Sequence, residues 1–260
     1  MTDKEILVAK GITKNFGGLI AVNNVDLKVF KGERHVIIGP NGSGKTTFIN
    51  LLTGVYQPNS GSIKLFNEEI ARLQPHKITE KGIARTFQNI RLFNSMTVWE
   101  NIALGMHSKT KTGVVQSILR KGGEPEERKI IENKVMEISS FLGIDSILQK
   151  NVLNLPYGKQ RIVEIGRAMA ASPKILILDE PAAGMNNKEV VGLADIIKRI
   201  SKLDMTVLLI EHNMDFVKDI ANSISVLDSG KKIAEGSFDD IQRNPQVIEA
   251  YLGKRGVTNA

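Results

Sequence analysis

The sequence predicts an α/β fold with a parallel β-sheet core, a β-rich edge and a helical segment inserted between about residues 89 and 160. Continuous apolar runs at 175–178 (ILIL) and 206–210 (TVLLI) flank a helical pattern at 188–202, as in strands that are buried on both faces of a parallel sheet. Ahead of them, residues 101–154 are mostly helical in pattern and charged. The helical part is therefore expected to interrupt the sheet core.

The N-terminal elements are expected to be β-strands. Residues 6–16 (ILVAKGITKNF) and 22–30 (VNNVDLKVF) alternate in polarity, and KGE at 31–33 indicates a turn. The apolar run HVIIG follows, and then TTFINLLTG, which has helical spacing and a glycine stop at Gly54. The order is strand, glycine-rich loop, helix.

Two later segments complete the prediction. The polar stretch SKTKTGVVQSILRKGGEPEER at 108–128 is expected to be an exposed insertion, and SISVLDSGKKIAEG at 223–236 places turn residues between two short strands. In LPYGKQ (155–160), Gly158 marks the expected start of a helix. A helix N-terminus offers unpaired N–H groups to an anion, although an ordinary loop-to-helix junction would have the same pattern.

Composition limits the classes of function. A chain of 260 residues with 42% apolar and 24% charged residues can bury a full core. No apolar stretch reaches the roughly 18 residues that cross a bilayer, and the N-terminus is charged, so we expect a soluble chain that stays where it is made. The net charge of +7 would suit nucleic acid, but no dense basic block is present. The absence of cysteine excludes disulfides, thiolate metal ligands and cysteine nucleophiles.

The segment GPNGSGKTT at 39–47 matches the phosphate-loop pattern G-x-x-x-x-G-K-[ST] in full, between an expected strand and helix. Gly42 and Gly44 would let successive N–H groups face phosphates, Lys45 would reach the β and γ oxygens, and the Thr46 hydroxyl would ligate Mg²⁺. The predicted nucleotide-binding residues here are Gly39, Pro40, Asn41, Gly42, Ser43, Gly44, Lys45, Thr46 and Thr47.

The run ILILDE at 175–180 supplies two carboxylates at the end of a buried strand. Asp179 can hold Mg²⁺ through its water shell, and Glu180 can polarise an attacking water. Acids after a strand also serve as caps or salt-bridge partners. Together with the phosphate loop, they favour a catalytic role.

Other classes of phosphate-loop protein fit less well. A GTPase needs N-K-x-D to read guanine, and NKEV at 187–190 lacks the aspartate. A small-molecule kinase does not explain Gln88 in ARTFQNIRLF, LPYGKQ, DEP at 179–181 and His212 in LLIEHNMD. With these elements in this order, the sequence resembles the ATP-binding cassette (ABC) ATPases across nearly the whole chain.

This resemblance implies a P-loop NTPase core of ABC type with an antiparallel β subdomain and an inserted helical subdomain. The expected parts are residues 1–88 with the β subdomain and phosphate loop, 89–160 as the helical subdomain, and 161–260 with the catalytic acid, the histidine loop and the C-terminal helix. LPYGKQ takes the place of the family signature, usually LSGGQ. In the family this helix faces the γ-phosphate held by a second cassette, so a same or related chain is an expected partner.

The signature departs from the usual pattern. Leu155, Gly158 and Gln160 fit the extended family pattern, whereas Pro156 replaces serine, Tyr157 the first glycine and Lys159 glutamine. Asn186 stands where the family has the aspartate of the D-loop.

The resemblance assigns further roles to residues outside the signature. Gln88 would sense Mg²⁺ and link the site to the inserted subdomain, and His212 would contact the γ-phosphate. Phe16 falls where the family stacks an aromatic ring on adenine, although phenylalanine in a strand is commonly a core residue. Because Glu180 and His212 are retained, an active ATPase that uses ATP and Mg²⁺ is expected.

Within the family, FGGLIAVNNVDLKV, RTFQNIRLF, LPYGKQR, DEPAAGMN and EAYLG resemble the ATPase subunits of branched-chain amino-acid importers. This implies permease subunits as partners and a place at the cytoplasmic face of the membrane. The lipopolysaccharide-export ATPase is the nearest alternative, and the insertion at 108–128 favours the importer. A soluble cassette ATPase acting on nucleic acid and a pure binding module are two further alternatives, and no nucleic-acid partner is expected.

Overall fold

The computed structural model describes residues 4–107 and 125–252 of the chain, which divides into two compact units. Unit 1 combines the N-terminal segment up to Lys81 with the C-terminal segment from Ile197, and unit 2 runs from Gly82 to Ile196. The boundaries expected at 88/89 and 160/161 stay a prediction. In the two described ranges, no helix is both long and apolar enough to span a membrane.

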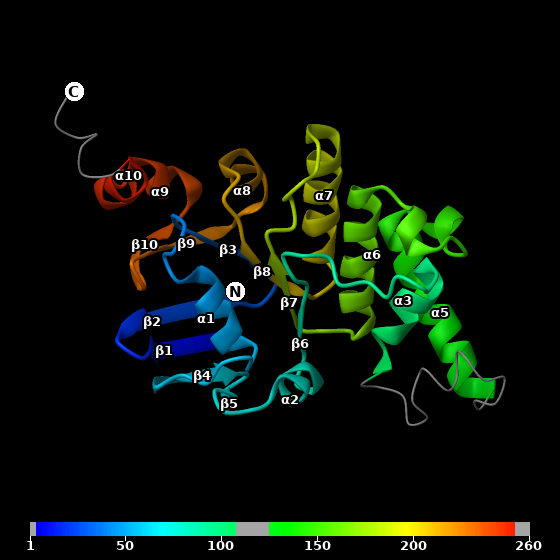
Figure 1. Ribbon diagram of the computed structural model, residues 1–260, viewed down its shortest axis with the longest axis horizontal. Helices are drawn as coiled ribbons and strands as arrows, with labels where there is room; N and C mark the ends of the chain where they lie inside the picture. The colour runs from blue at the N-terminus through cyan, green and yellow to red at the C-terminus, as the bar shows by residue number, and fades with distance from the viewer. Residues whose placement is uncertain (1–3, 108–124, 253–260) are drawn as a thin grey trace. The chain divides into compact units, whose positions relative to one another are not determined.

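The first sheet of unit 1 is antiparallel, with the strand order β2-β1-β4-β5 (Figure 1). Its strands are β1 (Glu5–Phe16), β2 (Leu19–Phe30), β4 (Ser60–Leu65) and β5 (Glu68–Glu69). Every second residue of β2 from Val25 through Leu27 to Val29 is buried, which is the alternation the sequence predicted. The predicted β-rich edge is confirmed.

The remaining strands of unit 1 have the order β10-β9-β3-β8. They are β3 (Arg34–Ile38), β8 (Thr206–Ile210), β9 (Ser223–Asp228) and β10 (Lys231–Gly236). Strand β3 is parallel to both β8 and β9, and β10 is antiparallel to β9. All of β8 is buried, as expected for a strand covered on both faces.

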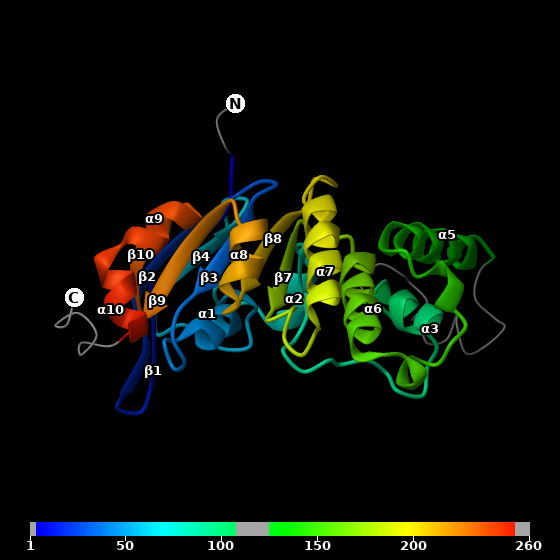
Figure 2. The same ribbon diagram turned by 90° about the horizontal axis from the view of Figure 1, so that it is seen from above.

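The helices of unit 1 are short. They are α1 (Lys45–Leu52), α2 (Pro75–Glu80), α8 (Met214–Ile220), α9 (Phe238–Arg243) and α10 (Pro245–Leu252). Helix α1 begins at the residue after Gly44, directly downstream of β3, so strand, glycine-rich loop and helix follow in the predicted order. Figures 1 and 2 show α9 and α10 beside β10.

Unit 2 pairs two parallel strands with a group of helices. The strands are β6 (Ile83–Arg85) and β7 (Ile175–Asp179), with Arg85 opposite Ile177. The helices are α3 (Val98–Leu104), α5 (Pro125–Leu142), α6 (Tyr157–Ala170) and α7 (Asn187–Ile200), with 3₁₀ turns at Asp145–Ile147 and Val152–Asn154. Helix α7 contains the boundary between the two units.

Helices α3, α5 and α6 lie side by side (Figures 1 and 2). A Cβ added at Gly166 of α6 would lie 3.0 Å from Leu142 Cδ1, so a small residue permits this close packing. Ile162, Ile165 and Met169 are buried along α6, as the helical pattern predicted. Of the insertion expected at 108–128, residues 108–124 lie outside the described residues and 125–128 open α5.

Candidate active site

The phosphate loop joins β3 to α1 and has a backbone that only glycine adopts easily. Gly42 and Gly44 have φ values of 78° and 98°, in the left-handed region. A Cβ at Gly44 would also collide with the backbone oxygen of Ala21, whereas one at Gly42 would meet no atom within 4 Å. Gly42 is therefore required by conformation alone, and Gly44 by conformation and space.

The start of α1 is arranged to receive an anion. Its N-cap is Gly44, which supplies no side-chain cap, and its first turn has no acidic residue. The first N–H groups of the helix and the positive end of its dipole therefore face the loop without a competing carboxylate of their own turn. Thr46 is exposed in this turn, where the sequence predicted a hydroxyl ligand.

Lys45 is held across the loop. Its side chain is buried, and Nζ donates to the carbonyl oxygens of Gly39 at 2.7 Å and Pro40 at 2.9 Å. Ser43 Oγ lies 3.4 Å from the same nitrogen. These are neutral acceptors, and a phosphate oxygen would make a stronger, charge-assisted bond with this ammonium group.

The C-terminal helix α10 also contacts the phosphate loop. The Tyr251 hydroxyl forms a hydrogen bond with the backbone of Gly39. Burial raises the pKa of Tyr251 to about 12, and the bond to Gly39 opposes that rise. Sequence analysis assigned EAYLG only to the family resemblance and missed this contact.

Phe16 lies at the end of β1 with 41% of its surface exposed. Its ring packs edge-to-face on Tyr56, with the centroids 5.2 Å apart, and Lys14 Nζ lies 5.2 Å from its centroid. The exposure removes the alternative that Phe16 is a core residue. Stacking on adenine stays a prediction.

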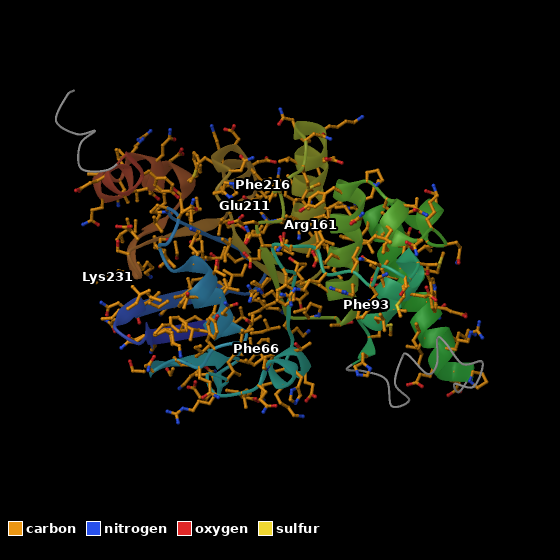
Figure 3. The ribbon with its side chains drawn as sticks, viewed as in Figure 1. Phe66, Phe93, Arg161, Glu211, Phe216 and Lys231 are labelled. Carbon is orange, nitrogen blue, oxygen red and sulfur yellow. The ribbon has the colours of Figure 1, made fainter. Side chains whose placement is uncertain are left out.

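His212 is exposed in the short turn between β8 and α8. Its backbone N–H donates to the carboxylate of the buried Glu211 at 3.0 Å. Asn213 caps α8 by accepting from the Phe216 N–H at 3.1 Å, and Glu211 and Phe216 are labelled in Figure 3. The turn is thus fixed at both ends by hydrogen bonds from backbone N–H groups to the Glu211 and Asn213 side chains.

In unit 2, Asp179 ends the buried strand β7 and forms an ion pair that sequence analysis did not predict. Arg85 Nη2 donates to Asp179 Oδ2 at 2.7 Å, and both side chains are less than 10% exposed. Arg85 belongs to the neighbouring parallel strand β6. The salt-bridge role that the sequence left open is therefore present.

Glu180 follows directly and has a φ of 46°, which is uncommon for a residue with a side chain. Gln88 Nε2 donates to Glu180 Oε2 at 3.2 Å. Two of the three predicted catalytic residues, Gln88 and Glu180, are therefore in contact within unit 2, although they are 92 positions apart in the sequence.

The signature turn starts α6 with Pro156 as N-cap and no side-chain cap. Leu155 is buried, and its carbonyl oxygen accepts from Gln160 Nε2 at 2.9 Å. A Cβ on Gly158 would collide with the Glu189 carboxylate. The predicted helix start is confirmed, one residue earlier than Gly158, while Lys159 is exposed on the first turn.

Tyr157 and Asn186 connect this turn to the loop after Glu180. A Cβ on Gly184 would lie 3.1 Å from Tyr157 Cε1, so the tyrosine ring covers that glycine. Asn186 Oδ1 accepts from the Glu189 N–H at 3.1 Å, and Glu189 Oε2 accepts from the Asn186 N–H at 3.0 Å. The asparagine in place of the family aspartate forms a reciprocal cap at the start of α7.

Arg161 is the main functional candidate that sequence analysis missed. It is fully buried on α6 (Figure 3). Its guanidinium donates to the carbonyl oxygens of Phe87 and Gln88, both at 2.7 Å. An arginine one position after LPYGKQ carries no signal of burial in a single sequence, because its partners lie more than 70 residues away.

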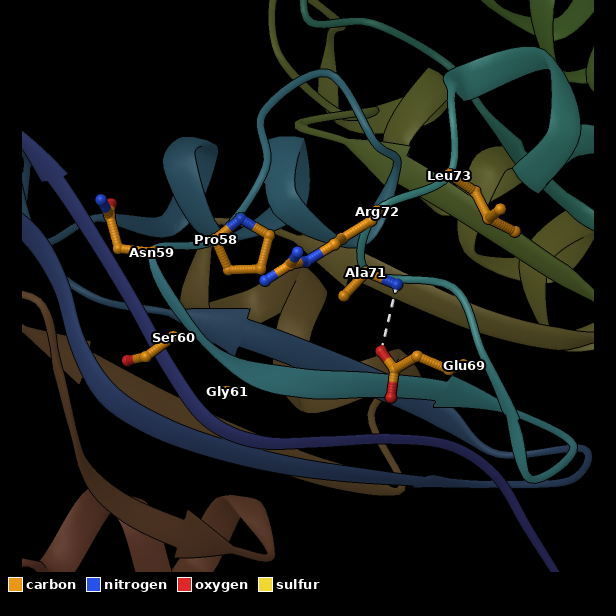
Figure 4. A pocket seen from close by; sticks show the side chains of 8 residues that line it. All are labelled: Pro58, Asn59, Ser60, Gly61, Glu69, Ala71, Arg72 and Leu73. Carbon is orange, nitrogen blue, oxygen red and sulfur yellow. Dashed lines mark hydrogen bonds between the residues drawn. The ribbon is translucent and has the colours of Figure 1, made fainter.

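Figure 4 shows a pocket that the sequence did not predict. It has a volume of about 180 Å³ in unit 1 and is lined by Pro58, Asn59, Ser60, Gly61, Glu69, Ala71, Arg72 and Leu73. The Glu69 carboxylate in it accepts from the backbone N–H groups of Ile63 and Ala71, at 2.9 and 3.2 Å. The Glu69 carboxylate thus stabilises the local turn. No predicted site residue lines the pocket.

Comparison with protein-family models gave two matches. Residues 22–183 match the family described as ABC transporter, and residues 231–257 match one described as branched-chain amino acid ATP-binding cassette transporter. The second match includes α10, whose Tyr251 contacts the phosphate loop.

Curated proteins of similar sequence extend over almost the whole chain. The high-affinity branched-chain amino acid transport ATP-binding protein BraF of Pseudomonas aeruginosa is 43% identical over 256 residues, covering 96% of this chain and 99% of BraF. LivG of Escherichia coli K12, described in the same words, is 41% identical over 253 residues, covering 96% and 98%.

Solved structures give the same result. A nucleotide-free ATP-binding cassette from an ABC transporter has a TM-score of 0.82 at 33% identity, covering 96% of this chain and all of that one. A cassette in its ADP conformation, also from an ABC transporter, has a TM-score of 0.84 at 32% identity with the same coverage. The expected fold class is confirmed.

Proposed function

The chain belongs to the ABC transporter family, as an ATP-hydrolysing subunit, and we propose that it powers the import of branched-chain amino acids. The similarity to BraF and LivG over 96% of the chain carries this proposal. The match of residues 231–257 supports the importer over the lipopolysaccharide-export alternative, because that family model is described for branched-chain amino acid cassettes.

The phosphate loop fits ATP. The uncapped start of α1 and the buried Lys45 provide backbone donors and a cation for phosphate oxygens. Phe16, exposed at the end of β1, would stack on the adenine ring. Thr46 and Asp179, with Gln88, would hold Mg²⁺, which when bound neutralises charge on the phosphate oxygens.

Hydrolysis would depend on Glu180 as the group that orients and polarises water. The bond from Gln88 Nε2 to Glu180 Oε2 supports this role, because it fixes the carboxylate direction and links it to a residue expected to respond to the metal. His212 would donate to the γ-phosphate from the turn after β8. We propose the same three parts of the chain as before: 1–88 with the phosphate loop, 89–160 as the helical subdomain, and 161–260 with the catalytic acid and the histidine loop.

A second cassette would complete each site. The start of α6 has no side-chain cap, so its N–H groups would act on the γ-phosphate held by a partner chain, same or related. Gly158 and its neighbours Leu155, Pro156, Tyr157, Lys159 and Gln160 would form this contact.

Permease subunits would dock on unit 2. A groove of about 490 Å³ lies there, lined by Thr97, Trp99, Glu100, Arg128, Glu132, Met136, Leu148 and Gln149. Met136 is 51% exposed, and the lining of the groove combines apolar side chains with charged ones. The occupant we propose is a segment of a membrane subunit, which would place the chain at the cytoplasmic face of the membrane.

The proposal is tested by uptake. In cells lacking the gene for this chain, uptake of labelled leucine, isoleucine and valine should fall, and that of lysine should not. Restoring the wild-type chain should restore uptake, and the chain should co-purify with membrane subunits. Unchanged uptake of all three amino acids would refute the substrate class while leaving the ATPase assignment in place.

The nucleic-acid alternative has its own test. A diffuse charge of +7 offers few simultaneous phosphate contacts, so we expect no tight binding of DNA at physiological salt. A gel shift over a range of salt concentrations measures this directly, and submicromolar binding would favour the alternative.

A further inference from the structure

A buried ion pair on α6 holds the segment that contains Gln88. Arg161 and Glu164 are 0% and 1% exposed, and Arg161 Nη1 lies 2.8 Å from Glu164 Oε2. Arg161 donates to the carbonyl oxygens of Phe87 and Gln88, and Glu164 Oε1 accepts from the Arg91 N–H at 3.1 Å. The pair therefore grips residues 87–91 at both ends, through backbone atoms only.

The cost of burying these charges indicates that the contacts matter. Two charges removed from water are tolerated only when good geometry and further hydrogen bonds satisfy them. Here the Nη atoms of Arg161 and the Oε1 atom of Glu164 make further hydrogen bonds to the segment 87–91 and to Tyr157, whereas Arg161 Nε has no hydrogen-bond partner among the described residues. A planar guanidinium suits two adjacent carbonyl oxygens, which a lysine ammonium would satisfy less well.

A surface pair of the same spacing shows the difference. Lys134 Nζ on α5 donates to both carboxylate oxygens of Glu137, at 2.9 and 2.8 Å, and the two side chains are 28% and 65% exposed. Such a pair stabilises its own helix slightly. The buried pair on α6 instead connects a helix to a distant segment.

The same guanidinium also touches the signature turn. Arg161 Nη2 donates to the Tyr157 hydroxyl at 3.1 Å, and the Tyr157 ring covers Gly184. Gln88 in turn donates to Glu180. The Arg161 side chain thus joins the backbone of Gln88 to Tyr157, the first residue of the signature helix. Gln88 is the residue that contacts Glu180.

We propose that Arg161 and Glu164 are positioning residues that fix the Gln88 segment to the signature helix, so that Gln88 stays at Glu180 when α6 engages a partner cassette. The role in turnover rests on the proposed function. The grip on residues 87–91 is a property of this chain alone and can be tested without turnover.

Two variants test the proposal. Arg161→Lys keeps a cation beside Glu164 but loses the planar pair of donors. The double variant Arg161→Met with Glu164→Met removes both charges together, so that neither is left buried alone. Arg167 Nη2, 4.0 Å from Glu164 Oε1, is 19% exposed and can turn to solvent.

Two controls separate positioning from general stability. Ile165→Val loses packing on the same helix, at a fully buried residue whose side chain has no hydrogen-bonding group. Lys134→Gln with Glu137→Gln removes the surface pair. Each variant is compared by thermal unfolding, by hydrogen exchange of residues 87–91 and by ATPase kinetics of the complex with its membrane subunits.

In the double variant, exchange of the Arg91 amide should accelerate at least about 10-fold, because its acceptor is lost. Exchange in α1 and the Kd for ATP should stay unchanged, since the phosphate loop is intact. The kcat should fall about 10–100-fold with little change in KM, as expected when a reacting group is displaced by about 1 Å. Arg161→Lys should lie between the double variant and wild type.

Two results would overturn the proposal: unchanged exchange at Arg91 in the double variant, or an equal loss of kcat in Ile165→Val at the same unfolding temperature. Should the wild-type complex fail to hydrolyse ATP, the proposed function would be wrong. Hydrogen exchange in the double variant would still test whether Arg161 and Glu164 hold residues 87–91. Acceleration confined to these residues would support the contact, and unchanged exchange would refute it.

Discussion

The phosphate loop and the signature turn both begin a helix without a side-chain cap, yet they are built differently. At the phosphate loop the shape comes from the chain itself, with Gly42 and Gly44 in left-handed conformations. At the signature turn Gly158 has an ordinary backbone conformation. The shape of this turn depends instead on contacts made by Tyr157, Arg161 and Glu189. The shape of one proposed anion site thus comes from glycine conformations, and that of the other from the side chains around it.

This difference predicts different consequences of substitution. A change in the phosphate loop should alter nucleotide binding at its own site, because the left-handed conformations of its glycines set the backbone that the proposed phosphate contacts need. A change at the signature turn should leave binding intact and alter turnover, since the residues around it reach Gln88 and the loop after Glu180. Four substitutions test this contrast.

The largest effect is expected for Glu180→Gln, because the proposed hydrolysis step depends on this carboxylate. An amide cannot accept a proton from water, and loss of a well-placed base costs about 10²–10⁴ in rate. Gln88 can still donate to the amide oxygen, so the local structure should persist. Single-turnover kinetics with ATP should show the slowed step, and the variant should accumulate as an ATP-bound dimer. Near-normal turnover would transfer the role to another residue, with His212 first.

Lys45→Ala tests the local site. The ammonium group meets the β and γ phosphates in the proposed complex, and losing its charge-assisted bonds should weaken ATP binding about 10²-fold. Titration calorimetry with Mg-ATP measures the change. An unchanged Kd would mean that the phosphate loop is not the nucleotide site.

Gly158→Asp tests the assembled site. A negative side chain at the start of α6 should oppose the γ-phosphate of the partner site, so ATP binding should persist and kcat should fall about 10–100-fold. The same side chain would also collide with Glu189. Glu189→Gln is the matched control: if it alone reproduces the loss, the contact within the chain explains the effect.

Mixing variants separates the two explanations. A pair of one Gly158→Asp chain and one Lys45→Ala chain contains one composite site with both lesions and one with neither, so some ATPase activity should return. If the signature turn serves only its own chain, no activity returns. Cross-linking must first show that the two variants pair.

The smallest effect is expected for Tyr157→Phe, which removes only the hydroxyl that accepts from Arg161. The ring should stay on Gly184, and the lost hydrogen bond costs about 1 kcal/mol of unfolding free energy. Chemical denaturation measures this value, and kcat should change by less than about threefold. A much larger loss of kcat would show that the hydroxyl itself takes part in coupling.

Much of the fold could be predicted because its signals are local. Apolar runs such as ILIL and the alternation of β2 depend on burial within a few residues, and the glycine positions of the phosphate loop depend on backbone conformation. These features follow from the residues that carry them. The helix start at LPYGKQ was predicted to within one residue for the same reason.

The features that were not predicted depend on contacts between residues far apart in the sequence, which a single sequence does not reveal. Arg85 and Asp179 meet because β6 and β7 are neighbours, and Arg161 meets Phe87 through the packing of α6. In the sequence these arginines are indistinguishable from surface cations. Tyr251 is a similar case, since nothing in EAYLG indicates a contact with Gly39.

The backbone at Glu180 has a consequence for the evolution of this chain. A left-handed φ of 46° at a residue with a Cβ costs about 1 kcal/mol that glycine or asparagine would largely avoid. Selection for thermal stability alone would therefore favour replacing this glutamate. A library sorted for heat resistance should enrich Glu180→Gly and Glu180→Asn, and a library sorted for growth on limiting leucine should remove both.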